Sequence, residues 1–137
     1  MRERSKSFYN AGISLLSQKC YDQSIVCFYY SVLQRMMYSL TVSRKRPVAY
    51  EKQNPLDEKL PFRMLEDIVL RMDSRYQRDI ETVKEYFGKK LYSARKKADY
   101  SQELCSQDEC VECRSMCEKV NSILDRFFNP DYSCAKQ

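Results

Sequence analysis

The chain has 137 residues, 43% of them hydrophobic, which fits one domain with a single core and excludes a chain that is disordered throughout. Its 2 glycines and 4 prolines are too few for the turns of an all-β domain, and no run of about 18 apolar residues is present to span a membrane. The net charge of +5 is moderate and by itself does not indicate nucleic acid. We therefore predict one all-α domain over residues 1–137.

Apolar positions at helical spacing predict the first two helices. In residues 4–18 the stripe includes Phe8, Ala11 and Leu15, which are three and four positions apart. Asp22 is a candidate N-cap for a second helix over residues 22–41. This helix is apolar on most sides, so we expect it at the centre of the domain, serving the core alone or both the core and a dimer interface.

A long polar connection is expected over residues 42–60, where Pro47 and Asn54-Pro55 interrupt the helical pattern. A third helix is predicted to begin near Pro61, and a fourth over residues 75–97. Gly88 lies inside the fourth helix, where we expect its missing side chain to permit a close backbone approach.

The fifth helix begins between Ser101 and Glu109. Ser106-x-x-Glu109 is a capping-box pattern, and Ser101 is a competing cap. Asn129-Pro130 ends the helix, and residues 129–137 are expected to form a loose tail.

The seven cysteines have two interpretations. An odd number in a chain whose charged first five residues do not resemble a secretion signal argues against a disulfide framework, and we expect a cytoplasmic protein. Cys110, Cys113 and Cys117 have a spacing that zinc sites use, with Cys105 or Cys134 as a fourth ligand. They also continue the apolar stripe of the fifth helix, which favours packing in the core. We therefore predict no metal site.

Histidine is absent, which excludes every catalytic Ser-His or Cys-His pair. Positive charge is concentrated in residues 84–97, which hold six basic residues against Glu85 alone: Lys84, Lys89, Lys90, Arg95, Lys96 and Lys97. This stretch is either a solvated helix face or a surface that binds phosphate. Several of the 11 tyrosines lie near it, and their rings can pack at the core edge or stack on bases.

The end of the fourth helix carries the motif Arg95-x-x-Ala98-Asp99-Tyr100, and the second helix opens with Tyr21-Asp-x-Ser-Ile25. Together with the order of an aromatic second helix, a long loop, a helix ending at the motif and a long last helix, these features resemble the HEPN family over residues 5–128. The motif is similar to that of a branch paired with minimal nucleotidyltransferases. The resemblance implies an up-and-down bundle of four to five helices that forms a homodimer.

Many HEPN proteins are metal-independent RNases of toxin–antitoxin or defence systems, with an arginine followed four to six residues later by histidine. By this resemblance Arg95 matches the family arginine, and Tyr100 or Ser101 takes the place of the histidine. A tyrosine with an ordinary pKa of about 10 is a poor base at neutral pH. We therefore do not expect RNase activity of the usual kind, and we expect no cofactor.

The resulting hypothesis is a basic groove at a homodimer interface that binds RNA or a nucleotide phosphate. Its candidate residues are Arg95, Lys96, Lys97, Lys89, Lys90, Asp99 and Tyr100. In it, Tyr100 stacks on a base or orients Arg95, whereas a local alternative is an ion pair between Arg95 and Asp99. Two other hypotheses stay open: an RNase toxin that uses Arg95 and Tyr100, and an interaction module that partners a nucleotidyltransferase.

Overall fold

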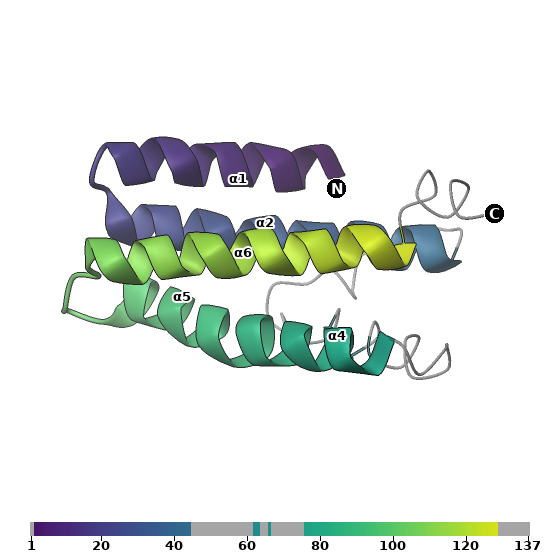
Figure 1. Ribbon diagram of the computed structural model, residues 1–137. Coiled ribbons are helices and arrows are strands. Elements are labelled where there is room, and N and C mark those ends of the chain that lie inside the picture. Colours follow the sequence, from purple (N-terminus) through teal and green to yellow (C-terminus); the bar gives the residue numbers. More distant parts are fainter. Residues whose placement is uncertain (1, 45–61, 64–65, 67–75, 129–137) are drawn as a thin grey trace.

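The computed structural model describes residues 2–44, 62–63, 66 and 76–128, and all regular structure within these ranges is helical (Figure 1). The helical segments are α1 (Arg2–Ser17), α2 (Tyr21–Arg44), α4 (Gln77–Val83), the π-helical η4 (Lys84–Leu91), α5 (Tyr92–Tyr100) and α6 (Gln107–Phe128). Because α4, η4 and α5 follow one another without a break, the described residues form four long helices. The prediction of an all-α fold is confirmed for this part of the chain.

The helices lie lengthwise beside one another. Figure 1 shows α6 between α1 and the helix made of α4, η4 and α5, with α2 behind it. The central position predicted for the second helix is correct, since α2 contacts α1, α6, η4 and α5. Its side chains Ile25, Phe28, Tyr29 and Val32 are fully buried, and the Tyr29 ring stacks on that of Phe87, with 5.0 Å between the ring centroids.

Asp22 is not the N-cap that the sequence suggested. Helix α2 begins one residue earlier, at Tyr21, after a tight turn in which Lys19 has a φ of 62°. The Asp22 carboxylate instead accepts a hydrogen bond of 2.9 Å from the backbone N–H of Cys105. It thus ties the start of α2 to the segment that precedes α6.

The close approach expected at Gly88 occurs at Gly12. A Cβ atom added to Gly88 would meet no atom of the described residues within 4 Å, whereas one added to Gly12 would lie 2.6 Å from Cε1 of Phe28. The hydroxyl of Ser24 also donates a 2.6 Å hydrogen bond to the Gly12 carbonyl oxygen. Helices α1 and α2 therefore touch at Gly12, and the prediction for Gly88 was wrong.

The π-helical segment keeps one row of side chains on the core face. Val83, Phe87, Leu91 and Arg95 are spaced by four residues, and each such step rotates a side chain by about 40° past a full turn of an ideal α-helix. The wider turns of η4 offset this drift. Val83, Phe87 and Leu91 are buried as a result, and Arg95 follows them inward.

The capping-box prediction for the last helix is confirmed. The Glu109 N–H donates a 3.1 Å hydrogen bond to Ser106 Oγ, and α6 begins at Gln107. The competing Ser101 instead follows the end of α5, where its hydroxyl oxygen accepts a hydrogen bond from the Glu103 N–H.

The sequence predicted that the long connection over residues 42–60 begins at residue 42. This start is too early, because α2 extends to Arg44. Its remainder, most of the third helix and the tail at 129–137 lie outside the described residues. Among the described helices, none is long and apolar enough to cross a membrane.

Candidate functional site

Arg95, the central residue of the hypothesis, lies against the core. Its side chain is 12% exposed, and its Nη2 donates a 3.1 Å hydrogen bond to the hydroxyl of Tyr30 on α2. The rings of Tyr29, Tyr30 and Tyr100 lie around the guanidinium, at 5.5, 5.7 and 5.9 Å from its central carbon. Cation–π contacts of this kind attract the guanidinium to the ring faces and stabilise its position.

Asp99 neutralises this arginine locally. One carboxylate oxygen of Asp99, Oδ2, lies 2.9 Å from Arg95 Nε, so the helix-end ion pair weighed as an alternative is present. Tyr100, by contrast, is 75% exposed. Within the motif, Arg95 therefore packs against the core, whereas Tyr100 faces solvent.

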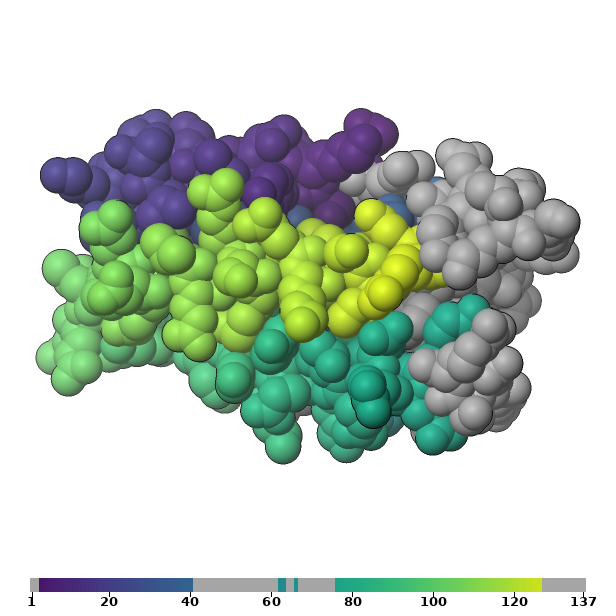
Figure 2. All heavy atoms as spheres, viewed as in Figure 1, coloured from purple at the N-terminus to yellow at the C-terminus, as the bar shows by residue number. Residues whose placement is uncertain are grey.

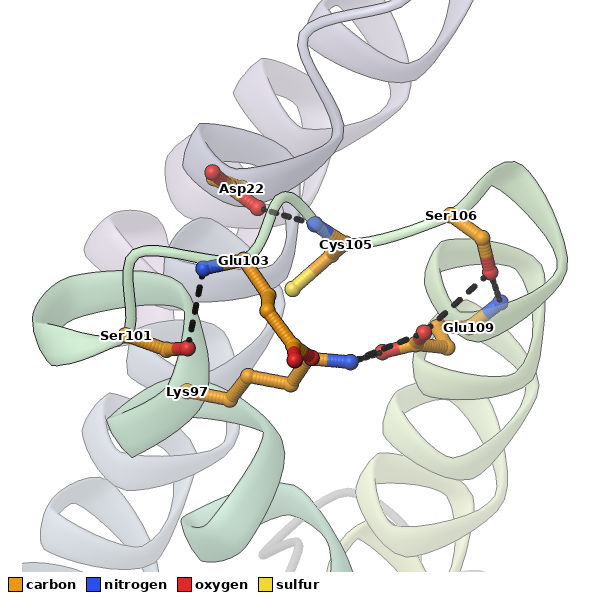
Figure 3. Close-up of polar contacts among 7 residues, drawn as sticks. All are labelled: Asp22, Lys97, Ser101, Glu103, Cys105, Ser106 and Glu109. Carbon is orange, nitrogen blue, oxygen red and sulfur yellow. Dashed lines mark hydrogen bonds and ion pairs between the residues drawn. The ribbon is translucent and has the colours of Figure 1, made fainter.

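Lys97 is held by the last helix (Figure 3). Its Nζ donates hydrogen bonds of 3.0 Å to both carboxylate oxygens of Glu109, beside the Ser106 cap. The hydrogen bond with Lys97 lowers the pKa of the Glu109 carboxyl, and the same bond raises the pKa of Lys97. This pair links α5 to α6 across the connection, and it is a structural contact.

Three of the predicted phosphate-binding residues point outward. Lys89, Lys90 and Lys96 are exposed on η4 and α5, whereas Phe87 and Leu91 of the same helix are buried. Lys90 lies over the ring of Tyr86 at 5.5 Å, and Lys96 over the ring of Tyr92 at 5.0 Å. Lys119 of α6 approaches the Tyr86 ring as well, at 6.0 Å. We call the set Lys89, Lys90, Lys96, Lys119, Tyr86 and Tyr92 the lysine–tyrosine surface.

Lys89 pairs with Glu85 at 3.6 Å, while no described carboxylate pairs with Lys90 or Lys96. The structure therefore brings together only part of the predicted phosphate site. Lys89, Lys90 and Lys96 are exposed to solvent, whereas Arg95, Lys97 and Asp99 are engaged in contacts within the protein.

The cysteines of α6 pack in the core, as one of the two interpretations held. Cys110, Cys113 and Cys117 are almost fully buried, and burial raises the pKa of the Cys113 and Cys117 thiols to about 12. Within the described part of the chain, no three Cys, Asp or Glu side chains are grouped as metal ligands would be. Cys134, a candidate fourth ligand, lies outside that part.

A polar pocket that the sequence analysis missed lies between α1, α2 and α6. Its volume is about 450 Å³, and its walls are formed by Ser5, Lys6, Tyr9, Asn10, Ser31, Arg35, Glu118, Asn121, Ser122 and Asp125. Figure 2 shows blue atoms of α2 between the purple atoms of α1 and the yellow half of α6, where the three helices meet. The buried Arg35 forms an ion pair with the half-exposed Asp125 there.

A signal for this pocket was present in the second helix. Ser24, Ser31, Arg35 and Ser39 are spaced by seven, four and four residues, so they form a polar line along an otherwise apolar helix. All four residues are buried. Of these four residues, Ser31 and Arg35 line the pocket, where α1 and α6 supply their partners Ser5, Asn121 and Asp125.

No family model matches the chain, and neither curated proteins nor solved structures provide a match. The functional argument therefore depends on the residues and their geometry.

Proposed function

We propose that the chain is a HEPN-like helical bundle that binds RNA or a nucleotide phosphate through the lysine–tyrosine surface and acts as a homodimer. One observation carries the proposal: Lys90 and Lys96 are exposed, have no described carboxylate partner, and lie over tyrosine rings. Cations interleaved with aromatic side chains suit single-stranded RNA, because the cations contact phosphates while the rings stack on bases.

In this proposal Arg95 has a supporting role. With Asp99 and Tyr30 as partners, its guanidinium fixes the end of α5 against α2, and the lysines supply the charge that meets phosphate. This differs from the hypothesis drawn from the sequence, in which Arg95 itself holds the phosphate. A phosphate bound by Arg95 would have to displace a carboxylate at 2.9 Å.

The homodimer is supported by the corner where α5 leads into α6. Tyr100, Leu104 and Val111 are the large hydrophobic side chains exposed within the described residues, at 75%, 83% and 47%. All three lie within 12 positions of one another along the chain. We propose that a second copy covers this corner, because large apolar side chains exposed close together along the chain are candidates for an interaction surface.

The RNA proposal is tested with a labelled single-stranded RNA and fluorescence anisotropy at several salt concentrations. The variant carries Lys89→Gln, Lys90→Gln and Lys96→Gln. Its matched control carries Arg4→Gln, Lys6→Gln and Lys19→Gln, which remove the same charge from exposed positions in and just after α1. We expect the first variant to lower the slope of log K against log salt by about 2, at roughly 0.7 per lost phosphate contact, and the control to leave it unchanged.

Equal effects of the two variants would show that RNA binding depends only on the net charge of the protein. Absence of RNA binding by the wild-type protein would contradict the proposal. For the dimer, we expect Leu104→Glu to halve the mass measured by light scattering. Gln102→Glu adds the same charge at a neighbouring exposed position and should leave the mass unchanged.

The interaction-module alternative has support from the same exposed corner, since a partner protein would cover it as well as a second copy. A monomer by light scattering that copurifies with a nucleotidyltransferase and does not bind RNA would favour it. The RNase alternative has less support, because the Arg95 guanidinium is neutralised by Asp99 and largely enclosed. RNA cleavage that disappears with Arg95→Ala would establish it.

A further inference from the structure

The pocket between α1, α2 and α6 has charged groups of both signs in its lining, and nothing in the proposed function uses it. We propose that it binds a free α-amino acid with a large side chain, whose carboxylate pairs with Lys6 and whose ammonium group pairs with Asp125. The inference is based on the size of the pocket, on the contacts that fix the helices around it, and on two opposite charges that are not paired with each other.

The size of the pocket suits an amino acid. Its volume of about 450 Å³ lies within the range of small-molecule pockets, whereas one water molecule accounts for only about 30 Å³ of liquid. Tyr9 forms part of the wall, so an apolar or aromatic side chain of the ligand has a ring to pack against. A small inorganic ion would leave most of this space to water.

Polar contacts hold the helices in place around the pocket. Ser5 and Ser31 each donate a hydrogen bond to the carbonyl oxygen of the other, at 2.7 and 2.8 Å, and these bonds tie α1 to α2. The buried Arg35 of α2 forms an ion pair with Asp125 of α6, and its guanidinium lies over the ring of Tyr38, 4.8 Å from the ring centroid. The pocket is therefore formed without a ligand, so binding costs little additional ordering of the protein.

Asp125 provides an oriented negative charge in the lining. Its side chain is half exposed, and its Oδ1 is paired with Arg35, whose side chain is only 4% exposed. A carboxylate that is paired through one oxygen can still accept a hydrogen bond from an ammonium group through the other. Glu118, seven residues earlier on the same face of α6, adds negative charge to the lining, although it also pairs with Arg114 at 3.3 Å. The α6 side of the pocket therefore favours a cationic group.

Lys6 provides a positive charge from α1. It is exposed and forms no ion pair with a described carboxylate, although Asp125 and Glu118 line the same pocket. The carboxylate of a ligand can therefore approach Lys6 without displacing a partner. A simple anion would gain this contact but would also approach two carboxylates, and a simple cation would be repelled by the lysine. A molecule that carries both charges gains both contacts.

The test compares phenylalanine with three probes that each lack one of its groups: 3-phenylpropanoate has no ammonium group, 2-phenylethylamine has no carboxylate, and glycine has no side chain. Each probe is titrated at pH 7 into the full-length ¹⁵N-labelled protein, and amide resonances are followed by NMR. We expect phenylalanine to shift the resonances of the lining residues Asn10 and Ser122. It should bind about fivefold more tightly than 3-phenylpropanoate or 2-phenylethylamine, because each of these loses one ion pair at a partly exposed site. Glycine should also bind more weakly than phenylalanine.

Lys6→Gln removes the positive charge, and we expect about a fivefold loss of affinity for phenylalanine and no loss for 2-phenylethylamine. Arg4→Gln removes the same charge from an exposed position of α1 outside the lining and should leave the affinity for phenylalanine unchanged. Asp125→Asn should weaken phenylalanine by a similar factor but not 3-phenylpropanoate.

The proposal would be overturned if another probe bound as tightly as phenylalanine, if Lys6→Gln and Arg4→Gln had equal effects, or if no probe bound. The comparison of probes needs only the wild-type protein, and Lys6 is exposed. The test therefore remains decisive even if Asp125→Asn, which leaves Arg35 without its carboxylate, fails to fold.

Discussion

Arg95 and Tyr30 connect α5 to α2 across 65 residues of sequence, through a 3.1 Å hydrogen bond from the guanidinium Nη2 to the phenol oxygen. The same guanidinium contacts the carboxylate of Asp99 one turn further along α5. An arginine that serves two helices and is 12% exposed stabilises the packing of the bundle. The motif that suggested a phosphate site is therefore first of all a structural joint between helices.

Replacing Arg95 tests this role. We expect Arg95→Gln to lower the free energy of unfolding by about 1.5–3 kcal/mol, the usual worth of hydrogen bonds to charged groups, and Arg95→Lys to lower it by less. Urea unfolding followed by circular dichroism measures the change. RNA binding at temperatures where the variant stays folded should fall less than in the Lys89, Lys90 and Lys96 triple variant. If Arg95→Gln left the stability unchanged but abolished RNA binding, Arg95 would instead be a residue that binds phosphate directly.

The sequence predicted those features that depend on neighbouring residues. Ser106 and Glu109 form their cap within one turn, so the structure confirms Ser106, one of the two caps that the sequence left open. The mostly apolar character of α2 likewise placed it at the centre, because a helix that is apolar on most sides must be surrounded by other helices.

Features that depend on distant partners were missed. Asp22 has the chemistry of an N-cap, but its partner is the N–H of Cys105, 83 residues away. The inward direction of the Arg95 side chain depends on the π-helical turns of η4, and no pattern in the sequence predicts a π-helix there. The polar pocket requires three helices to meet, and only the polar line along α2 hinted at it.

The two glycines should respond in opposite directions to alanine. In Gly12→Ala the new methyl group would lie 2.6 Å from Phe28, whose ring is fully buried and packed against that of Tyr9. We expect overpacking to cost about 1–3 kcal/mol, more than the gain in helix propensity. In Gly88→Ala the new methyl group meets no atom in the described part of the chain, so this change should be neutral or stabilising by up to about 1 kcal/mol. Thermal unfolding of both variants measures the difference, and a stable Gly12→Ala protein would contradict the close α1–α2 contact.

The Lys97–Glu109 pair should give a defined pH dependence. The pKa of Glu109 is lower in the folded protein than in the unfolded chain, so its contribution is complete above about pH 5 and is lost as the pH falls through the folded pKa. Glu109→Gln retains a side chain suited to the capping box and removes only the charge. We expect the melting temperature of this variant to lie slightly below that of the wild type at pH 7, and the difference to shrink as the pH falls below the ordinary glutamate pKa of about 4.3, as measured by differential scanning calorimetry. A difference that stays constant as the pH falls would show that the charge is not its cause.

Alkylation of the native protein tests the burial of the α6 cysteines. Cys20 and Cys27 are half-buried, whereas Cys105, Cys110, Cys113 and Cys117 are buried. Burial raises the pKa of the Cys113 and Cys117 thiols to about 12, which leaves little of the reactive thiolate at pH 8. We expect iodoacetamide to modify tryptic peptide 20–35 within minutes, and peptides 98–114 and 115–119 only after denaturation, as read by mass spectrometry. Rapid labelling of peptide 115–119, which holds Cys117, would mean that α6 opens readily from the core and that the pocket it helps to form is not permanent.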